Sequence, residues 1–202
     1  MLKAQLDRIH TIVGRIATEF SEIEMLWYLV FTCLLGNTSR AAVDAIFNNL
    51  RSGAQQRQMI LDVATAVLDN KSGFYQSIKK LAEETKMLAG RRNDAVHSII
   101  HIFQAAIPPH IAAGGTSKPS RLSAKQIGPE IAEIYRAILF HQLDMHELRL
   151  QAIRHADPKM NLSREEQQLA RARQEIPRDL SSDPILQALL QQQEPPSPPS
   201  EA

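Results

Sequence analysis

The sequence predicts an all-α protein: an up-down helical bundle with long first, motif-bearing and final helices, followed by a flexible C-terminal tail. Two observations favour this fold class. Apolar residues recur at alternating spacings of three and four, the period of an α-helix, and no segment shows the convincing two-residue alternation of a strand. The 202 residues include 44% hydrophobic and 22% charged side chains, which is typical of a globular protein with a buried core.

The first helix is predicted to be about 30 residues long and to end at Gly36-Asn37, a pair suited to a left-handed cap. From Ile23 onward nearly every position is apolar, so we expect this half to be buried on all sides. A helix of this length is best covered by two other helices of a bundle. Its apolar seam consists of Leu6, Ile9, Val13, Ile16, Phe20, Ile23, Trp27, Val30 and Leu34.

Two shorter helices and a second long helix are expected next. Residues 39–49 form the first, with Ala42, Ala45 and Ile46 facing inward. Ser52 caps the second, whose apolar residues are Met59, Ile60, Val63, Ala66 and Val67. The long helix follows Gly73 and continues to about Gln104, with Gly90 as a point where it can bend.

The last long helix is predicted to begin after a loop over residues 105–119, which is rich in proline and glycine. Ser123 and Gln126 have the spacing of a capping box at its start, and Asp157-Pro158 ends it. Its inward residues are Ile131, Ile134, Ile138, Met145 and Leu148.

Three regions follow from this pattern: a bundle over residues 1–157, a charged and glutamine-rich extension over 158–193, and a disordered Pro/Ser tail over 194–202. Ser163 with Glu166 opens a short helix in the extension. The amphipathic stretch Pro184–Leu190 has two interpretations that stay open. It docks a partner protein, or it packs back on the bundle.

Charge and composition exclude several classes of protein. The net charge is +1, so no global electrostatic footprint indicates nucleic-acid binding, although a local basic patch remains compatible with it. The lone Cys33 cannot form an intrachain disulfide, and we interpret it as a small buried side chain in a reducing compartment. The apolar run over residues 25–35 is too short to span a bilayer, and no signal peptide is recognisable, so we expect a cytoplasmic protein without membrane contact.

The stretch over residues 92–97, Arg-Asn-Asp-Ala-Val-His, is the strongest functional pattern. An imidazole transfers protons near neutral pH, and a guanidinium stabilises charge that develops on a phosphate. These are the two roles needed to cut RNA without a metal. On a regular helix Arg92 lies beside the apolar stripe, whereas Asn93 and His97 share a neighbouring row, about 140° from Arg92 to His97.

The Arg92-Asn93-x-x-x-His97 pattern resembles the signature of the HEPN superfamily, whose members are all-helical "higher eukaryotes and prokaryotes nucleotide-binding" domains. The predicted bundle also resembles the HEPN architecture over roughly residues 1–156. The resemblance implies a homodimer in which two motif helices meet and a shared cleft contains both Arg–His pairs.

It further implies a metal-independent endoribonuclease that acts as a toxin or defence effector, without a cofactor. His97 would assist attack of the RNA 2′-hydroxyl or protonate the leaving oxygen, and Arg92 would hold the phosphate. Asn93 would position the phosphate or the imidazole. Arg91 and Lys86 would attract the RNA backbone.

Glu24 lies in the apolar half of the first helix and has two open interpretations. It pairs with Arg92 or Arg91 across the bundle, or it orients His97 and fixes the tautomer of the imidazole. An antitoxin is a possible protein partner, but Ile99 stands where some HEPN proteins carry a tyrosine that a nucleotidyltransferase antitoxin modifies. That form of control is therefore doubtful here.

A metal site is the weaker interpretation of the histidines. His97 and His101 have a spacing that can bind a metal, but Ser98 replaces the glutamate of a His-Glu-x-x-His motif. A third ligand would have to be His110 or His141, and His141 lies in the seam of the last helix, where a core or interface role is favoured. The alternative function is a non-catalytic HEPN-like scaffold whose tail recruits a partner.

Overall fold

The computed structural model describes residues 2–106 and 127–190. Within these ranges the chain is entirely helical in its regular structure, which confirms the predicted all-α class. The helices are α1 (Leu2–Leu34), α2 (Arg40–Asn48), α3 (Gly53–Val67), α4 (Gly73–Ala106), α5 (Ile127–Ala156), α6 (Ser163–Ser182) and α7 (Pro184–Leu190).

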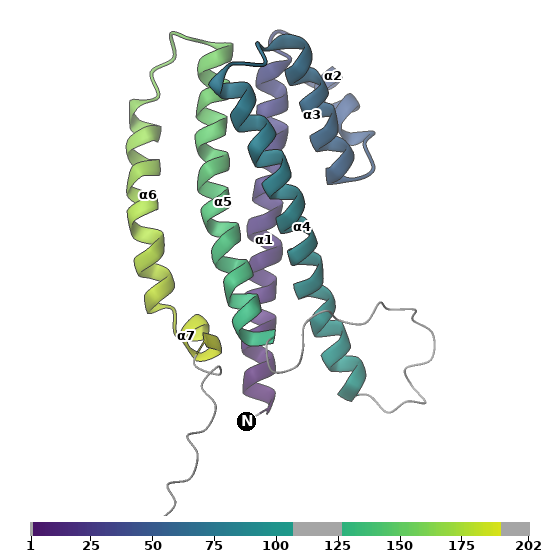
Figure 1. Cartoon of the computed structure of the whole chain (residues 1–202), viewed down its shortest axis with the longest axis vertical. Helices are drawn as coiled ribbons and strands as arrows, with labels where there is room; N and C mark the ends of the chain where they lie inside the picture. Colours follow the sequence, from purple (N-terminus) through teal and green to yellow (C-terminus); the bar gives the residue numbers. More distant parts are fainter. Residues whose placement is uncertain (1, 107–126, 191–202) are drawn as a thin grey trace, which may run out of the picture.

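Three long helices, α1, α4 and α5, form the centre of the bundle, and α6 lies along the outer side of α5 (Figure 1). Helices α1 and α5 run in the same direction, whereas α4 and α6 run in the opposite direction (Figure 1). Helices α2 and α3 cover α1 at one end, where the rings of Tyr28 and Phe47 pack at 5.3 Å between centroids. The short α7 lies at the other end.

The predicted apolar seam of α1 is the centre of the core. All its members are buried except Leu6, which is half-buried. Trp27, Phe20 and Phe31 are among the largest fully buried side chains. The five inward residues predicted for α5 are buried as well, so helical periodicity identified both sides of the main helix–helix contact.

The end of α1 and the start of α3 follow the predicted capping chemistry. Gly36 has a φ of +56°, the left-handed conformation expected after the end of α1. Ser52 accepts a hydrogen bond from the Gln55 backbone N–H at 3.3 Å, as predicted, and Ser39 caps α2 in the same way through the Ala42 N–H at 3.3 Å. Helix α4 continues through Gly90 as one helix.

The face predicted for α2 was wrong. In α2 the buried residues are Val43 and Phe47, whereas Ile46 is exposed, because the Phe47 ring packs against Tyr28 and Phe31 of α1. In α3 the buried residues are Arg57, Ile60 and Ala64. Of the apolar residues noted in its sequence, Ile60 is buried, Met59 and Val63 are half-buried, and Ala66 and Val67 are exposed.

The extension beyond α5 is more ordered than expected. A short helix was predicted from Ser163, but α6 has 20 residues and packs along α5 although Leu180 is its one buried residue. Helix α7 packs back on the bundle: Leu186 and Leu189 are buried, and the helix contacts α1 and α5. Of the two interpretations of Pro184–Leu190, the structure therefore favours the second.

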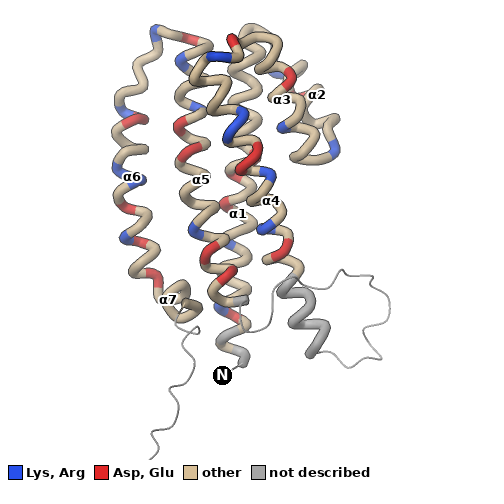
Figure 2. Tube along the Cα trace, viewed as in Figure 1, with Lys and Arg blue, Asp and Glu red and all other residues tan. Residues whose placement is uncertain are grey.

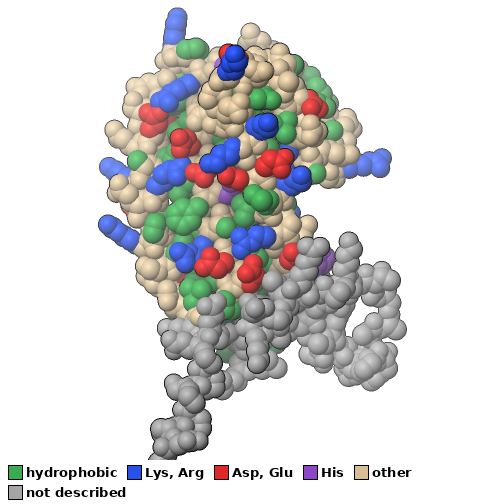
Figure 3. Space-filling model, viewed as in Figure 1, with side chains coloured by type: hydrophobic (Ala, Val, Ile, Leu, Met, Phe, Trp, Pro, Cys, Tyr) green, Lys and Arg blue, Asp and Glu red, His purple; other side chains and the backbone are tan. Residues whose placement is uncertain are grey.

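Charged residues of both signs are distributed along the long helices (Figure 2). The face in Figure 3 likewise mixes Lys and Arg with Asp and Glu. None of the helices in the described ranges combines the length and apolar character needed to cross a bilayer. The predicted loop beyond Ala106, the capping box of Ser123 and Gln126, and the tail over 194–202 lie outside the described residues.

Candidate functional site

The motif residues lie in the second half of α4, on the face predicted for each. Arg92 is half-buried beside the core residues Leu88 and Ala95, whereas Asn93 and His97 are exposed. The arginine therefore lies at the edge of the core, and the histidine faces away from it. One copy of the chain presents the two groups in different directions.

Arg92 is held by an aromatic ring instead of a carboxylate. Its guanidinium carbon lies 4.8 Å from the centroid of the Phe20 ring, a cation–π contact between α4 and α1. Its Nε is buried and has no hydrogen-bond partner among the described residues, and no carboxylate of those residues forms an ion pair with it. The guanidinium therefore has no counter-ion among the described residues.

The two basic residues predicted to attract RNA are engaged in surface ion pairs. Arg91 Nη2 lies 3.1 Å from Glu130 Oε1 of α5, and Lys86 Nζ lies 3.6 Å from Glu83 Oε2. Their side chains are 40% and 73% exposed. Exposed pairs contribute little to stability and exchange readily, so a polyanion can replace the carboxylates.

Glu24 lies elsewhere. Its carboxylate faces the start of α3: a Cβ atom on Gly53 would lie 2.8 Å from Glu24 Oε1 and 3.1 Å from Arg57 Nη1. Burial lowers the pKa of Arg57, and the negative charge of Glu24 opposes that change. Glu24 thus compensates a buried guanidinium of α3, and the structure does not bring it to Arg92 or His97 by any contact among the described residues.

The outer face of α4 around the motif is not covered by another helix of the described chain. Met87 is 63% exposed, and Gly90, Asn93 and His97 follow it on the exposed side. A Cβ atom on Gly90 would meet nothing within 4 Å. This exposed strip is a surface that a second molecule can approach closely.

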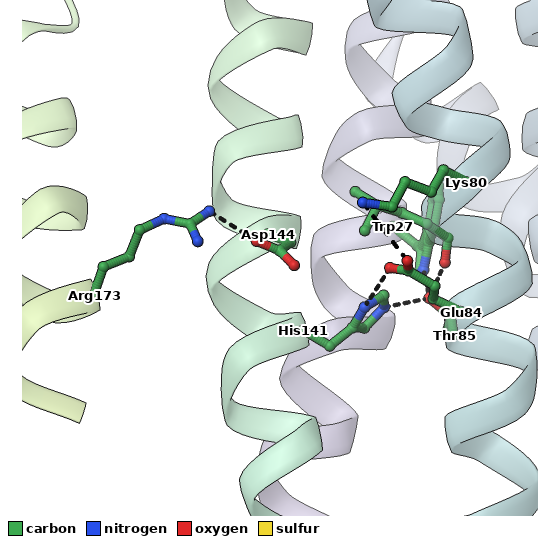
Figure 4. Close-up of polar contacts among 8 residues, drawn as sticks. Trp27, Lys80, Glu84, Thr85, His141, Asp144 and Arg173 are labelled. Carbon is green, nitrogen blue, oxygen red and sulfur yellow. Dashed lines mark hydrogen bonds and ion pairs between the residues drawn. The ribbon is translucent and has the colours of Figure 1, made fainter. Parts of the chain in front are cut away.

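A buried polar chain crosses the bundle two turns away from Arg92 (Figure 4). Trp27 Nε1 donates to Thr85 Oγ1 at 3.0 Å, and the same oxygen lies 2.7 Å from His141 Nε2. His141 Nδ1 lies 3.5 Å from Glu84 Oε2. The chain links α1, α4 and α5 through side chains that are buried, except for Glu84 at its end.

The network specifies the state of His141. Burial lowers the pKa of its imidazole, although the nearby carboxylate of Glu84 opposes this, so the ring is neutral at neutral pH. Nδ1 of the neutral ring faces the Glu84 carboxylate, and Nε2 faces the Thr85 oxygen, whose own proton is donated to the Leu81 carbonyl at 2.7 Å. Each donor in the chain has an acceptor. The role of this network is to fix how the three long helices pack together.

The sequence predicted a core or interface role for His141, which is buried, but did not identify its partners. Thr85 occupies a position on the apolar stripe of α4, between Leu81 and Leu88, where a buried hydroxyl needs a hydrogen-bond partner. Arg57 of α3 is likewise a buried polar residue that needs a partner. The described residues contain no group of three or more side chains suited to hold a metal ion, and the His101 side chain lies outside them.

Comparison with known proteins assigns no family to the chain. Neither family models, curated proteins nor solved structures yield a match to the chain.

Proposed function

We propose that this chain is a metal-independent endoribonuclease of HEPN type that works as a two-fold dimer, with Arg92 and His97 as its reacting residues. The observation that carries the proposal is the state of Arg92. Its guanidinium is held at the edge of the core by Phe20, it has no carboxylate partner among the described residues, and it lies on the same helix as an exposed histidine.

The chemistry needs a proton carrier and a stabiliser of negative charge. His97 accepts the proton of the RNA 2′-hydroxyl as the new O–P bond forms, or donates a proton to the 5′-oxygen as the P–O bond breaks. Arg92 stabilises the negative charge on the non-bridging oxygens. Asn93 positions the phosphate or the imidazole, while Arg91 and Lys86 exchange their surface carboxylates for the RNA backbone.

A second copy of the chain is part of the proposal. Arg92 and His97 are about 140° apart around α4, so one helix presents them poorly to a single phosphate. The strip of Met87, Gly90, Asn93 and His97 leaves room for the α4 helix of a symmetric partner. In cells such an enzyme would act as a toxin or defence effector, with an antitoxin as a possible partner.

The test is RNA cleavage by the purified protein in the presence of a chelator. We expect wild type to cut a mixed-sequence single-stranded RNA, and His97→Ala and Arg92→Ala to lose activity by about 10²-fold or more. Arg51→Ala and His155→Ala alter exposed residues of the same types away from the motif, His155 lying beside Phe74 at the start of α4, and should retain activity. Circular dichroism and a thermal melt show whether each variant is folded.

Two results would replace this proposal with the alternative of a non-catalytic binding or scaffold protein. One is the absence of cleavage by the folded wild-type dimer. The other is cleavage that persists unchanged in His97→Ala. Expression in a host gives an independent readout, since wild type should arrest growth and the two motif variants should not.

A further inference from the structure

A pocket of about 450 Å³ lies between α1, α5 and α6, and no residue of α4 lines it. Its volume is within the range of small-molecule sites. Three helices form its walls, with Glu19 and Glu22 from α1 and Glu165 from α6 among the lining residues. The site is therefore distinct from the Arg92–His97 region in both position and composition.

One part of the pocket is apolar. Leu143 and Leu150 of α5 are buried core residues that line it, and Leu169 and Ala172 of α6 lie opposite. A ligand that fills this part must carry hydrocarbon, because a fully polar molecule would lose hydration without a hydrogen-bond partner there.

The other part carries an excess of negative charge. Three carboxylates face a single permanent cation, Arg149. His146 also lines the pocket, and burial together with Arg149 lowers the pKa of its imidazole, so it is neutral at neutral pH. The buried Gln142 side chain donates a hydrogen bond to Glu22, which orients that carboxylate.

The carboxylates of the pocket repel one another. Burial and the neighbouring charge of Glu22 raise the pKa of Glu19. Glu22 and Glu165 form no ion pair with another described residue. A positive charge placed between the two glutamates of α1 would relieve their repulsion, whereas an anion would add to it.

We infer that this pocket binds a small organic cation, an ammonium group on a hydrocarbon body, with the charge against Glu19 and Glu22 and the hydrocarbon against the leucines of α5 and α6. The inference does not depend on nuclease activity, since it concerns different helices.

The test uses three probes of similar shape and different charge: benzylammonium, benzyl alcohol and benzoate. Calorimetric titration of the full chain at pH 7.5 should give a Kd of about 0.1–1 mM for benzylammonium, a value suited to a fragment of this size. The alcohol should bind at least about tenfold more weakly, and benzoate should not bind.

Variants locate the site. Glu22→Gln should weaken benzylammonium binding by about tenfold, while Arg149→Gln should tighten it, because the competing cation is removed. Glu133→Gln is the matched control on an exposed carboxylate of α5 outside the pocket and should leave the affinity unchanged. Thermal melts of all variants confirm that they are folded.

Equal affinity for the ammonium and the alcohol would overturn the inference. So would an unchanged affinity in Glu22→Gln, or the absence of benzylammonium binding by the folded protein at millimolar concentration.

Discussion

At the scale of single residues, Thr85 connects the long helices. Its hydroxyl oxygen accepts a hydrogen bond from Trp27 at 3.0 Å and lies 2.7 Å from His141 Nε2, and its proton is donated to the Leu81 carbonyl one turn earlier at 2.7 Å. A buried network of this kind is valuable when every member is satisfied and costly when one member is removed.

We expect Thr85→Val to lower the free energy of unfolding by about 1–3 kcal/mol, since the isosteric side chain leaves the Trp27 and His141 nitrogens without their shared partner. Urea denaturation followed by Trp27 fluorescence measures this. Thr18→Val is the matched control, because Thr18 makes the same bond to the carbonyl four residues earlier but is exposed. Equal effects of the two substitutions would contradict the prediction.

His141 also makes stability depend on pH. Its folded pKa is lowered by burial, so the unfolded chain takes up a proton near pH 6.5 while the folded chain does not. The free energy of unfolding should therefore fall as the pH drops from about 7 towards 5.5. His146, with a pKa lowered by burial and by Arg149, adds to the same trend.

Urea denaturation over this pH range checks the sign. His141→Gln should reduce the slope. A stability that stays constant below about pH 6.5 in the wild type would show that His141 titrates as in the unfolded chain.

At the scale of elements, α7 depends on the bundle for its position. Asp183 accepts hydrogen bonds from Arg15 at 2.5 Å and from the Ile185 and Leu186 backbone N–H groups at 2.8 and 3.2 Å. Burial alone would raise the pKa of Asp183, but the bonds from Arg15 and from these N–H groups outweigh it and lower the pKa. One carboxylate thus caps α7 and ties it to α1.

We expect Leu186→Ala to release α7, because the buried leucine supplies the apolar contact that holds a helix too short to be stable alone. Hydrogen exchange should accelerate over residues 180–190 and stay unchanged in α1, α4 and α5. Asp183→Asn should produce the same pattern to a smaller extent, and Asp179→Asn, on an exposed residue of α6, should not. Slower exchange throughout α7 than in α1 would be inconsistent with this view.

At the scale of the whole molecule, the proposed dimer depends on the exposed strip of α4. The exposed strip of α4 contains a glycine whose substitution costs no space within the chain, since nothing lies within 4 Å of a Cβ at Gly90. Gly14 on α1 is equally open and is not on α4. Substitutions at both glycines should leave the fold intact, so a difference between them reports on association through α4.

If two chains associate through α4, Gly90→Leu should raise the dissociation constant of the dimer by about tenfold or more, because the added side chain fills the space between the helices. Gly14→Leu should leave it unchanged. Sedimentation equilibrium measures both, and thermal melts should show that both variants are folded. A wild-type chain that is monomeric at about 0.1 mM would contradict association through this face.

Several features of the protein followed from the sequence by itself: the helical class, the seam of α1, the inward residues of α5, and the caps at Gly36 and Ser52. These features depend on neighbours a few residues apart, so periodicity and capping chemistry determine them.

Only the tertiary structure decided where Glu24 points, which residues His141 contacts, and that α7 returns to the bundle. Each of these depends on the rotation and register of helices that are distant in the chain. A change of one residue in position turns a helical side chain by about 100°, which is enough to bring a polar group to a different partner. The apolar pattern of the sequence does not specify the rotation to that accuracy.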